Sequence, residues 1–349
     1  LSWFLMRLPR LRSLFRAALA ALALLLVFGA GLAFYAQQRL EAFAARPVVG
    51  PEGATLVVPR GASFAQILAA LRGAGIEAGH DLEWKALAWR RDALRRLKAG
   101  EYALAPGASP EAVLRQMVEG RVITYRFTLV EGWSMRELRA AIARDPVLVD
   151  DIAGLDDAAL MAELGRAGVP AEGRFLPETY LFTRGDRASR LLGRAADAMD
   201  RALAEAWEGR EDGLPIRSPE ELLVLASIIE KETGKAEERP EIAGVFVRRL
   251  RLGMRLQTDP TVIYGLGEAF DGNLRRRDLE TDTPFNTYTR HGLPPTPIAM
   301  PGRAALEAAA RPLPGDTLYF VSRGDGSHVF SRTYDEHRAA VRRYQLGGR

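Results

Sequence analysis

An uncharged apolar run at residues 17–36 constrains this chain more than any other feature. A helix of about 20 residues, rising about 1.5 Å per residue, spans the roughly 30 Å hydrocarbon core of a bilayer. Four arginines precede the run: Arg7, Arg10, Arg12 and Arg16. Because positive charge marks the cytoplasmic end of a span, we expect a cytoplasmic tail at residues 1–16 and a transmembrane helix at 17–36. The alternatives are a buried core helix, which the arginines disfavour, and a cleaved signal peptide, whose apolar region is usually only about 7–15 residues long.

Composition narrows the chemistry of the rest of the chain. The 349 residues are 48% hydrophobic and 26% charged, which suits about two globular domains. The absence of cysteine excludes disulfides, thiol nucleophiles and thiolate metal sites, and the four histidines are too scattered for a zinc motif. The net charge of +4 equals the charge of the four arginines before the apolar run, so the remainder is close to neutral. We therefore expect no metal, no cofactor and no nucleic-acid partner.

After a connector at residues 37–51, three segments share one pattern: an apolar strand, a turn with glycine, and a serine that opens a helix. They are residues 56–63, 104–109 and 129–134. Each serine is a predicted N-cap. The pattern is equally typical of internal duplication and of ordinary mixed α and β proteins. A helical stretch is predicted from Met135 to about Ala206, and residues 209–215 form a linker-like break.

A strong helix start lies at Ser218, with proline at the first helical position and Glu221 placed to close a capping box. The next eight residues, 222–229, have no polar face, so this helix is predicted to be buried all round. Glu230 follows directly, and Gly234 fits the end of the helix. Apolar neighbours and the negative end of the helix dipole both disfavour an ionised carboxylate, so we expect a raised pKa at Glu230, as a general acid requires.

The bland alternative is that Glu230 only pairs with a lysine or arginine where the helix reaches the surface. Glu230 and Glu232 cannot lie on either side of one scissile bond, because residues two apart on a helix point to different sides. A glycosidase with paired carboxylates would therefore need its second carboxylate from another element.

The chain resembles the endolytic murein transglycosylases, the YceG-like family, in four blocks. The matching residues are 226–233 (ASIIEKET), 238–264 with its segment 257–262 (QTDPTV), 286–302 with Asn286-Thr287-Tyr288, and Glu172-Gly173 with Pro177-Glu178-Thr179-Tyr180. Together the matches span about residues 50–345. Departures from the family pattern stand at four positions: Leu176, Arg248, Phe285 and Thr296.

The resemblance implies a mixed α+β catalytic domain at residues 127–349 that cleaves the bond between N-acetylmuramic acid and N-acetylglucosamine within glycan strands. Glu230 would be the one catalytic acid and base, and the products would carry 1,6-anhydro ends. Residues 52–126 resemble a LysM module, a small β-α-α-β fold that binds N-acetylated glycans. The apolar run and the arginines before it predict attachment to the inner (plasma) membrane with a periplasmic or extracytoplasmic bulk. An enzyme anchored there would meet nascent strands, so peptidoglycan synthases are expected as partners. Trimming or termination of nascent strands would be its role.

Six further residues are expected to hold the sugar, because amide, carboxylate and hydroxyl groups hydrogen-bond its acetamido and hydroxyl groups. They are Glu232, Gln257, Thr258, Asp259, Asn286 and Tyr288. Four of them have an ordinary alternative: Asp259 as an N-cap before Pro260, Asn286 as a turn residue, Tyr288 as a packed aromatic, and Glu232 as a group that tunes Glu230 or caps a neighbour. Tyr264, outside this set, is also expected to be a packed aromatic.

The C-terminal part is predicted to be scaffold. Residues 281–301 form a loop, a helix covers 303–311, a hairpin joins 318–321 to 328–330, and a last helix covers about 334–344. Two rival functions stay open: a glycan-binding scaffold without catalysis that recruits wall-synthesis enzymes, and a hydrolase.

Overall fold

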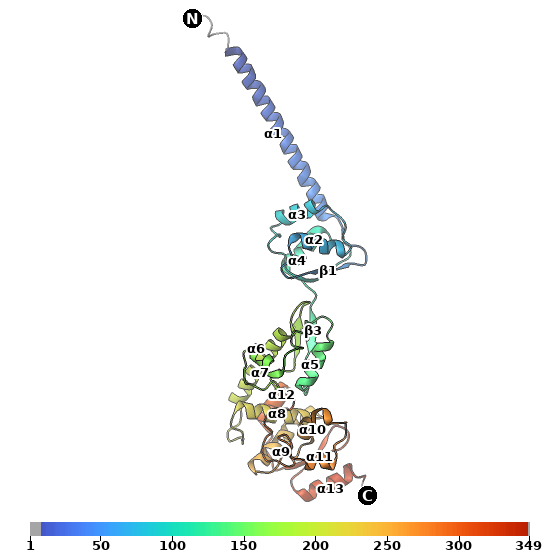
Figure 1. Ribbon diagram of the computed structural model, residues 1–349, viewed down its shortest axis with the longest axis vertical. Coiled ribbons are helices and arrows are strands. Elements are labelled where there is room, and N and C mark those ends of the chain that lie inside the picture. Colours follow the sequence, from blue (N-terminus) through green and yellow to red (C-terminus); the bar gives the residue numbers. More distant parts are fainter. Residues whose placement is uncertain (1–7, 348–349) are drawn as a thin grey trace. The chain divides into compact units, whose positions relative to one another are not determined.

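The computed structural model describes residues 8–347, which fold into two compact units divided between Thr124 and Tyr125. Both units combine helices with antiparallel strands, so the predicted mixed α and β class is confirmed. Within the described residues, the strands form three separate pairs, β1–β2, β3–β4 and β5–β6 (Figure 1).

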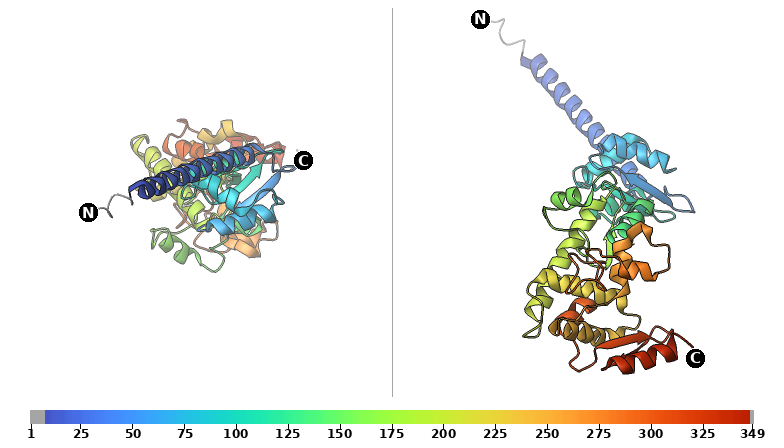
Figure 2. Two further views of the ribbon diagram at one scale, coloured as in Figure 1. Left: turned by 90° about the horizontal axis from the view of Figure 1, so that it is seen from above. Right: turned by 60° about the horizontal axis from the view of Figure 1, so that its bottom comes forward.

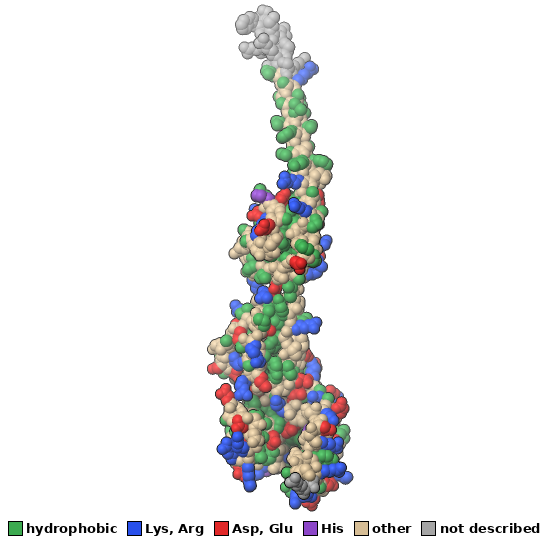
Figure 3. Space-filling model, turned by 90° about the vertical axis from the view of Figure 1, so that its right-hand side faces the viewer, with side chains coloured by type: hydrophobic (Ala, Val, Ile, Leu, Met, Phe, Trp, Pro, Cys, Tyr) green, Lys and Arg blue, Asp and Glu red, His purple; other side chains and the backbone are tan. Residues whose placement is uncertain are grey.

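Helix α1 runs from Leu8 to Ala45 and contains the whole apolar run. Its part Leu14–Ala45 is long and apolar enough to cross a membrane, and its most apolar stretch is unburied. Figure 3 shows hydrophobic side chains along this helix and charged ones only near its ends. The helix continues beyond the predicted end at residue 36 because its last turns pack on the first unit. Of the predicted tail, residues 1–7 lie outside the described part of the chain.

The first unit is built around one antiparallel strand pair, with Leu56 opposite Tyr102. Its elements are β1 (Ala54–Val58), α2 (Phe64–Gly73), α3 (Asp81–Arg90), β2 (Gly100–Leu104) and α4 (Pro110–Glu119). The buried side chains of Leu56, Trp84 and Tyr102 form its core, and Phe43 at the end of α1 packs edge-on against Trp84 at 5.4 Å. The order β1-α2-α3-β2 is the β-α-α-β order that the resemblance to a LysM module implies.

The second unit begins with a strand pair that the sequence did not predict. Strand β3 (Tyr125–Thr128) pairs with β4 (Thr179–Phe182), and Phe127 lies opposite Tyr180. The prediction of one helical stretch from Met135 to Ala206 is therefore wrong. Three helices occupy that region: α5 (Met135–Arg144), α6 (Asp157–Glu163) and α7 (Ala188–Glu208). The predicted break after Ala206 is confirmed, because no helix or strand lies between the end of α7 and Ser218.

Helix α8 (Pro219–Glu232) passes through the centre of this unit, and every residue from Leu222 to Ile229 is buried. It packs against α7, α9 (Arg239–Arg251), α10 (Asp259–Leu266) and α12 (Arg303–Ala310). A short 3-10 turn, η1 (Ala236–Glu238), joins α8 to α9. The prediction of a helix buried all round is confirmed.

Of the remaining elements, β5 (Tyr319–Ser322), β6 (His328–Ser331) and α13 (Tyr334–Tyr344) match the predicted hairpin and last helix. The short elements η2 (Gly267–Ala269) and α11 (Arg276–Glu280) were not predicted. In the hairpin Phe320 lies opposite Phe330, and α13 packs beside its strands (Figure 2). Residues 281–301 contain no helix or strand, as predicted.

The predicted serine caps are confirmed at Ser63, Ser109 and Ser134, each of which accepts a hydrogen bond from a backbone N–H of its helix. Ser218 likewise accepts from the Glu221 N–H. The predicted capping box at this helix is wrong, because the Glu221 carboxylate accepts from the N–H of Arg217 instead, at 2.6 Å.

Gly234 does not end α8 by a left-handed conformation, as the sequence suggested. Thr233 caps the helix in an extended conformation. A side chain at 234 would instead overlap the carbonyl oxygen of Gly326, in the turn of the β5–β6 hairpin. The glycine therefore permits a close approach between α8 and the hairpin.

Candidate active site

Glu230 lies in the last turn of α8, directly after the buried apolar run. Its side chain is 6% exposed. One carboxylate oxygen, Oε2, accepts a hydrogen bond from the backbone N–H of Gly302 at 2.9 Å. The other, Oε1, lies 3.5 Å from Nη2 of Arg239. The carboxylate thus has one firm backbone donor and one long contact with a cation.

Burial raises the pKa of the Glu230 carboxyl above its ordinary value, because the ionised form loses its solvation among apolar side chains. The Gly302 N–H and the Arg239 guanidinium oppose this rise, while the negative charge of Glu131 adds to it. The predicted direction of the pKa shift is confirmed. The alternative that Glu230 pairs with a basic residue is partly met, since Nη2 of Arg239 lies 3.5 Å from the carboxylate. This contact is too long to cancel the rise in pKa that burial causes.

Two loops enclose the Glu230 side chain. The N–H of Gly132, after β3, donates to the carbonyl of Met300 at 2.9 Å, and the Met300 N–H donates to the carbonyl of Trp133 at 2.7 Å. Gly132 has φ +77°, and a Cβ added there would stand 4.0 Å from Cγ of Glu230. A Cβ at Gly302 would overlap the carboxylate of Glu131. The positive φ favours glycine at 132, whereas the space beside Glu230 would admit a Cβ at ordinary contact distance.

A cleft of about 890 Å³ is lined by Lys231, the residue after Glu230, although Glu230 itself is not one of its lining residues. It is lined on one side by Gly132 and Lys231, the neighbours of Glu230, and on the other by α5 and α10. Further polar groups face it: Ser134, Glu137, Asp157, Glu172, Tyr264 and Glu268. A space of this size can hold a short stretch of sugar chain.

Glu172 is the second buried carboxyl of the cleft, and it was not among the predicted site residues. It is 8% exposed, and its oxygens accept hydrogen bonds from the Met135 N–H at 3.0 and 3.1 Å and from the Tyr264 hydroxyl at 3.1 Å. Burial raises the pKa of this carboxyl to about 7. Its place beside Gly173 in a family block was the only signal in the sequence.

Glu232 points away from Glu230, as its spacing predicts. Its Oε1 accepts a hydrogen bond from the Thr258 hydroxyl, and burial raises the pKa of the Glu232 carboxyl while that hydrogen bond opposes the rise. The Thr258 N–H donates to the Thr287 hydroxyl at 3.0 Å. These buried groups hold the segment before α10 against the loop at residues 286–288.

Gln257, Asp259 and Tyr288 also belong to this cluster. Gln257 has φ +49°, an uncommon conformation for a residue with a side chain, and its N–H donates to the Thr287 carbonyl at 3.1 Å. The Tyr288 hydroxyl donates to Oδ1 of Asp259 at 2.6 Å, and burial raises the pKa of Tyr288. Asp259 is the first residue of α10 and Thr258 is its N-cap, so the alternative of Asp259 as N-cap is wrong by one position.

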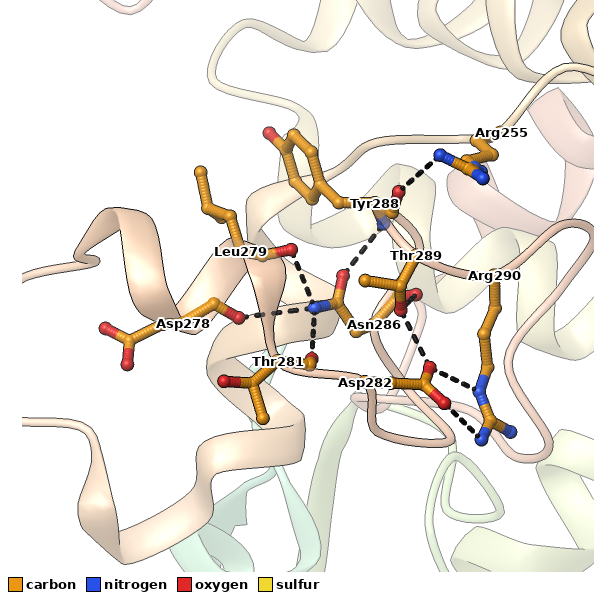
Figure 4. A network of polar contacts seen from close by, with 9 residues as sticks. All are labelled: Arg255, Asp278, Leu279, Thr281, Asp282, Asn286, Tyr288, Thr289 and Arg290. Carbon is orange, nitrogen blue, oxygen red and sulfur yellow. Dashed lines mark hydrogen bonds and ion pairs between the residues drawn. The ribbon is translucent and has the colours of Figure 1, made fainter.

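Asn286 is fully buried, and its side chain is used entirely within the loop. Figure 4 shows its Nδ2 among three carbonyl oxygens, those of Asp278, Leu279 and Thr281, at 2.7–3.2 Å. Its Oδ1 accepts from the Tyr288 N–H at 2.8 Å. These hydrogen bonds position the loop, and the contact of Asn286 with a sugar stays a prediction.

The structure thus gathers the predicted residues into one cluster around Thr258 and Thr287, separate from the hydrogen bonds of Glu230. Among the described residues, the groups that contact the Glu230 carboxylate are Gly302 and Arg239. The part of the chain at 8–347 contains no group of three His, Asp or Glu residues suited to a metal ion.

Residues 56–343 match the sequence profile of the YceG-like family. The chain is similar to the endolytic murein transglycosylase of Bacillus subtilis strain 168, with 33% identity over 264 residues that cover 71% of this chain and 73% of the relative. It is also similar to the endolytic murein transglycosylase of Streptococcus pneumoniae strain D39, with 26% identity over 325 residues. These cover 81% of this chain but only 57% of that relative.

Among solved structures, the fold is similar to that of a YceG-like protein of Listeria monocytogenes. The TM-score is 0.55 at 30% sequence identity, and the match covers 82% of this chain and 98% of the solved chain.

Proposed function

Because the chain belongs to the YceG-like family, we propose that it is a membrane-anchored lytic transglycosylase that cleaves peptidoglycan strands internally. The observation that carries this proposal is the burial of the Glu230 carboxyl, which raises its pKa. A carboxyl that is 6% exposed, with its pKa raised by burial and one oxygen held by a backbone N–H, is suited to act first as an acid and then as a base.

In the first step, Glu230 donates its proton to the glycosidic oxygen between N-acetylmuramic acid and N-acetylglucosamine. The bond from that oxygen to C1 of the muramic residue breaks, and positive charge develops on the ring. Because the Gly302 N–H already occupies Oε2, the free proton resides on Oε1. The leaving N-acetylglucosamine then carries a new hydroxyl, and Glu230 is ionised.

In the second step, the ionised Glu230 takes the proton from the C6 hydroxyl of the muramic residue while that oxygen attacks C1. A 1,6-anhydro ring forms, no water is consumed, and Glu230 regains its proton. Arg239 and the Gly302 N–H stabilise the intervening carboxylate. One carboxyl is sufficient for this sequence, whereas a hydrolase needs a second to activate water or act as a nucleophile.

The cleft beside Glu230 would hold the strand, with Tyr264, Ser134 and Glu137 available as hydrogen-bonding groups. Nε of Arg239 is buried and has no hydrogen-bond partner among the described residues. We retain exposed Gln257 and Asp259 as proposed sugar contacts, and we assign positioning roles to Glu232, Thr258, Asn286 and Tyr288.

Location completes the proposal. Helix α1 would anchor the chain in the plasma membrane with its N-terminus in the cytoplasm, so that the catalytic unit meets nascent strands outside. The first unit, with its β-α-α-β order, would bind glycan. Trimming or terminating these strands places peptidoglycan synthases among the expected neighbours, and recovery of none of them from a mild-detergent pull-down would count against that partnership.

A hydrolase is the second candidate, because Glu131 supplies a second carboxylate whose negative charge raises the pKa of Glu230. Mass spectrometry of digested, purified glycan separates the two reactions. Hydrolysis leaves reducing ends that are heavier by one water than the anhydro ends of a transglycosylase. We expect anhydro ends, and reducing ends as the main product would overturn the proposal.

A further inference from the structure

The outer face of α3 is apolar and unusually exposed. Leu82 and Trp89 are 70% and 76% exposed, and Lys85 and Ala86 lie between them on the same face. These four residues are spaced three and four apart, so they form one stripe along the helix. A tryptophan this exposed is unusual in a folded domain, because its ring loses a large amount of buried apolar area.

Helix α3 is fixed to the end of α1. Nε of Arg39 lies 3.2 Å from the Glu83 carboxylate, Nη2 of Arg90 lies 2.8 Å from the Glu41 carboxylate, and Phe43 packs on Trp84. Because Trp84 faces the core, the stripe of Leu82 and Trp89 faces the opposite way. Figure 1 shows α3 at the end of the first unit from which α1 leaves.

The distance along α1 determines what can lie against this stripe. Residues 39–43 follow the end of the apolar run at 36 by about 5–10 Å, at about 1.5 Å per helical residue. The headgroup layer on each side of a bilayer is about 5–8 Å thick. Helix α3 therefore meets α1 at the depth of the lipid headgroups, where tryptophan is enriched and where an amphipathic helix buries its apolar face.

The charges near the stripe also favour a lipid surface as its partner. The stripe itself contains the exposed Lys85, and three exposed arginines, Arg91, Arg95 and Arg96, follow α3 closely in the chain. Arg91 pairs with Glu41 and Glu111, whereas within the described residues Arg95 and Arg96 have no ion-pair partner. A stripe of leucine and tryptophan bordered by lysine and arginine is the pattern that binds anionic lipid surfaces.

We infer that the face of α3 formed by Leu82, Lys85, Ala86 and Trp89 docks on the bilayer surface and fixes the first unit there. The inference rests on the proposed anchoring of α1. The contact adds a second attachment to the one that α1 provides, so the first unit is held at the membrane surface at two places. A glycan-binding first unit would then be confined to strands that lie next to the membrane.

The full-length chain has no cysteine, so a single labelled cysteine can report the depth of one position. We would place it at Ala86, within the stripe, and in a control at Ala103, an exposed alanine on β2 of the same unit. Each variant is labelled with a polarity-sensitive fluorophore and reconstituted into vesicles of phosphatidylcholine and phosphatidylglycerol, with and without a lipid that carries a nitroxide quencher near its headgroup. Flotation verifies insertion.

We expect the quencher lipid to remove most of the emission at position 86 and little at 103. Adding Leu82→Ser and Trp89→Ser should abolish most of the loss at 86, while glycan cleavage measured in detergent stays unchanged. Equal, weak quenching at both positions in inserted protein would overturn the inference and leave the anchor and the enzyme intact. A blue-shifted emission at position 86 that increases with the protein-to-lipid ratio and does not change with the quencher lipid would overturn the inference. It would indicate that a second copy of the chain covers the face of α3. Failure to float would overturn the anchor together with the docked face.

Discussion

The backbone N–H of Gly302 lies 2.9 Å from Oε2 of Glu230 and donates a hydrogen bond to it. This bond joins the last turn of α8 to the N-cap residue of α12, across 72 residues of sequence. It stabilises the ionised carboxylate, whereas burial and the charge of Glu131 favour the protonated form. The pKa of Glu230 is therefore set by opposing contacts, and changing one of them should move it in a known direction.

Glu131→Gln should shift the alkaline limb of the pH profile of kcat/KM to lower pH. The substitution removes a like charge that raises the pKa of Glu230, so the catalytic proton is lost at lower pH. Activity at the optimum should be retained. The control is Glu163→Gln, at an exposed carboxylate on the end of α6, which should leave the profile unchanged. Complete loss of cleavage in the Glu131 variant would instead identify a hydrolase with two essential carboxylates.

Glu172 should make the folded state less stable as pH rises. Its pKa is raised from 4.5 to about 7 in the folded chain, so the folded state holds this proton more tightly than the unfolded state. The contribution is fully present below pH 4.5 and is lost as pH rises through about 7.

In the Glu172→Gln variant the side chain at this position cannot ionise, so the variant should not lose this part of its stability as pH rises. Chemical denaturation of both proteins at pH 4.5 and pH 8 measures it. We expect wild type to lose up to about 3 kcal/mol relative to the variant between these values. Parallel changes in the two proteins would show that the Glu172 carboxyl has an ordinary pKa.

Gly234→Ala should destabilise the second unit by about 1–3 kcal/mol, because the new methyl group overlaps the backbone carbonyl of Gly326 and must push the hairpin away from α8. Thermal unfolding of the full chain measures the effect. Gly154→Ala is the matched control, since a Cβ at that position meets nothing within 4 Å. Equal melting temperatures for the two variants would contradict the close approach.

Asn286→Asp should cost at least about 3 kcal/mol of unfolding free energy, because a carboxylate would face three carbonyl oxygens that now accept hydrogen bonds from Nδ2. Asn273→Asp, at an exposed position, should change stability little. Denaturant titration compares the two. A stable Asn286→Asp variant with weakened glycan binding would support the direct contact between Asn286 and a sugar that the sequence suggested.

Local signals in the sequence were sufficient for several parts of this structure. The apolar run, the serine caps at 63, 109 and 134, the hairpin and the buried helix before Glu230 each depend on residues close together in the chain. The direction of the Glu230 pKa shift could be predicted for the same reason, because its apolar neighbours precede it directly.

The rest depends on contacts between distant residues. Strand β4 has four residues and is identified only by its pairing with β3, in which Thr128 and Thr179 are 51 residues apart. Gly302 and Glu172 reach the site across similar separations, as does the cluster that joins Thr258 to Thr287. The residue type of Asn286 suits both a sugar contact and a loop anchor, and its burial, which the sequence does not show, favours the loop anchor.

The central claim is that one buried carboxyl performs both proton transfers. Glu230→Gln keeps the size of the side chain and an oxygen to accept from the Gly302 N–H, but it can neither donate nor take up the catalytic proton. The decisive measurement is the yield of anhydro-ended fragments from purified glycan strands, by mass spectrometry, for wild type and for this variant folded to the same stability. We predict a loss of at least about 100-fold. Anhydro-ended fragments at the wild-type yield would contradict the account.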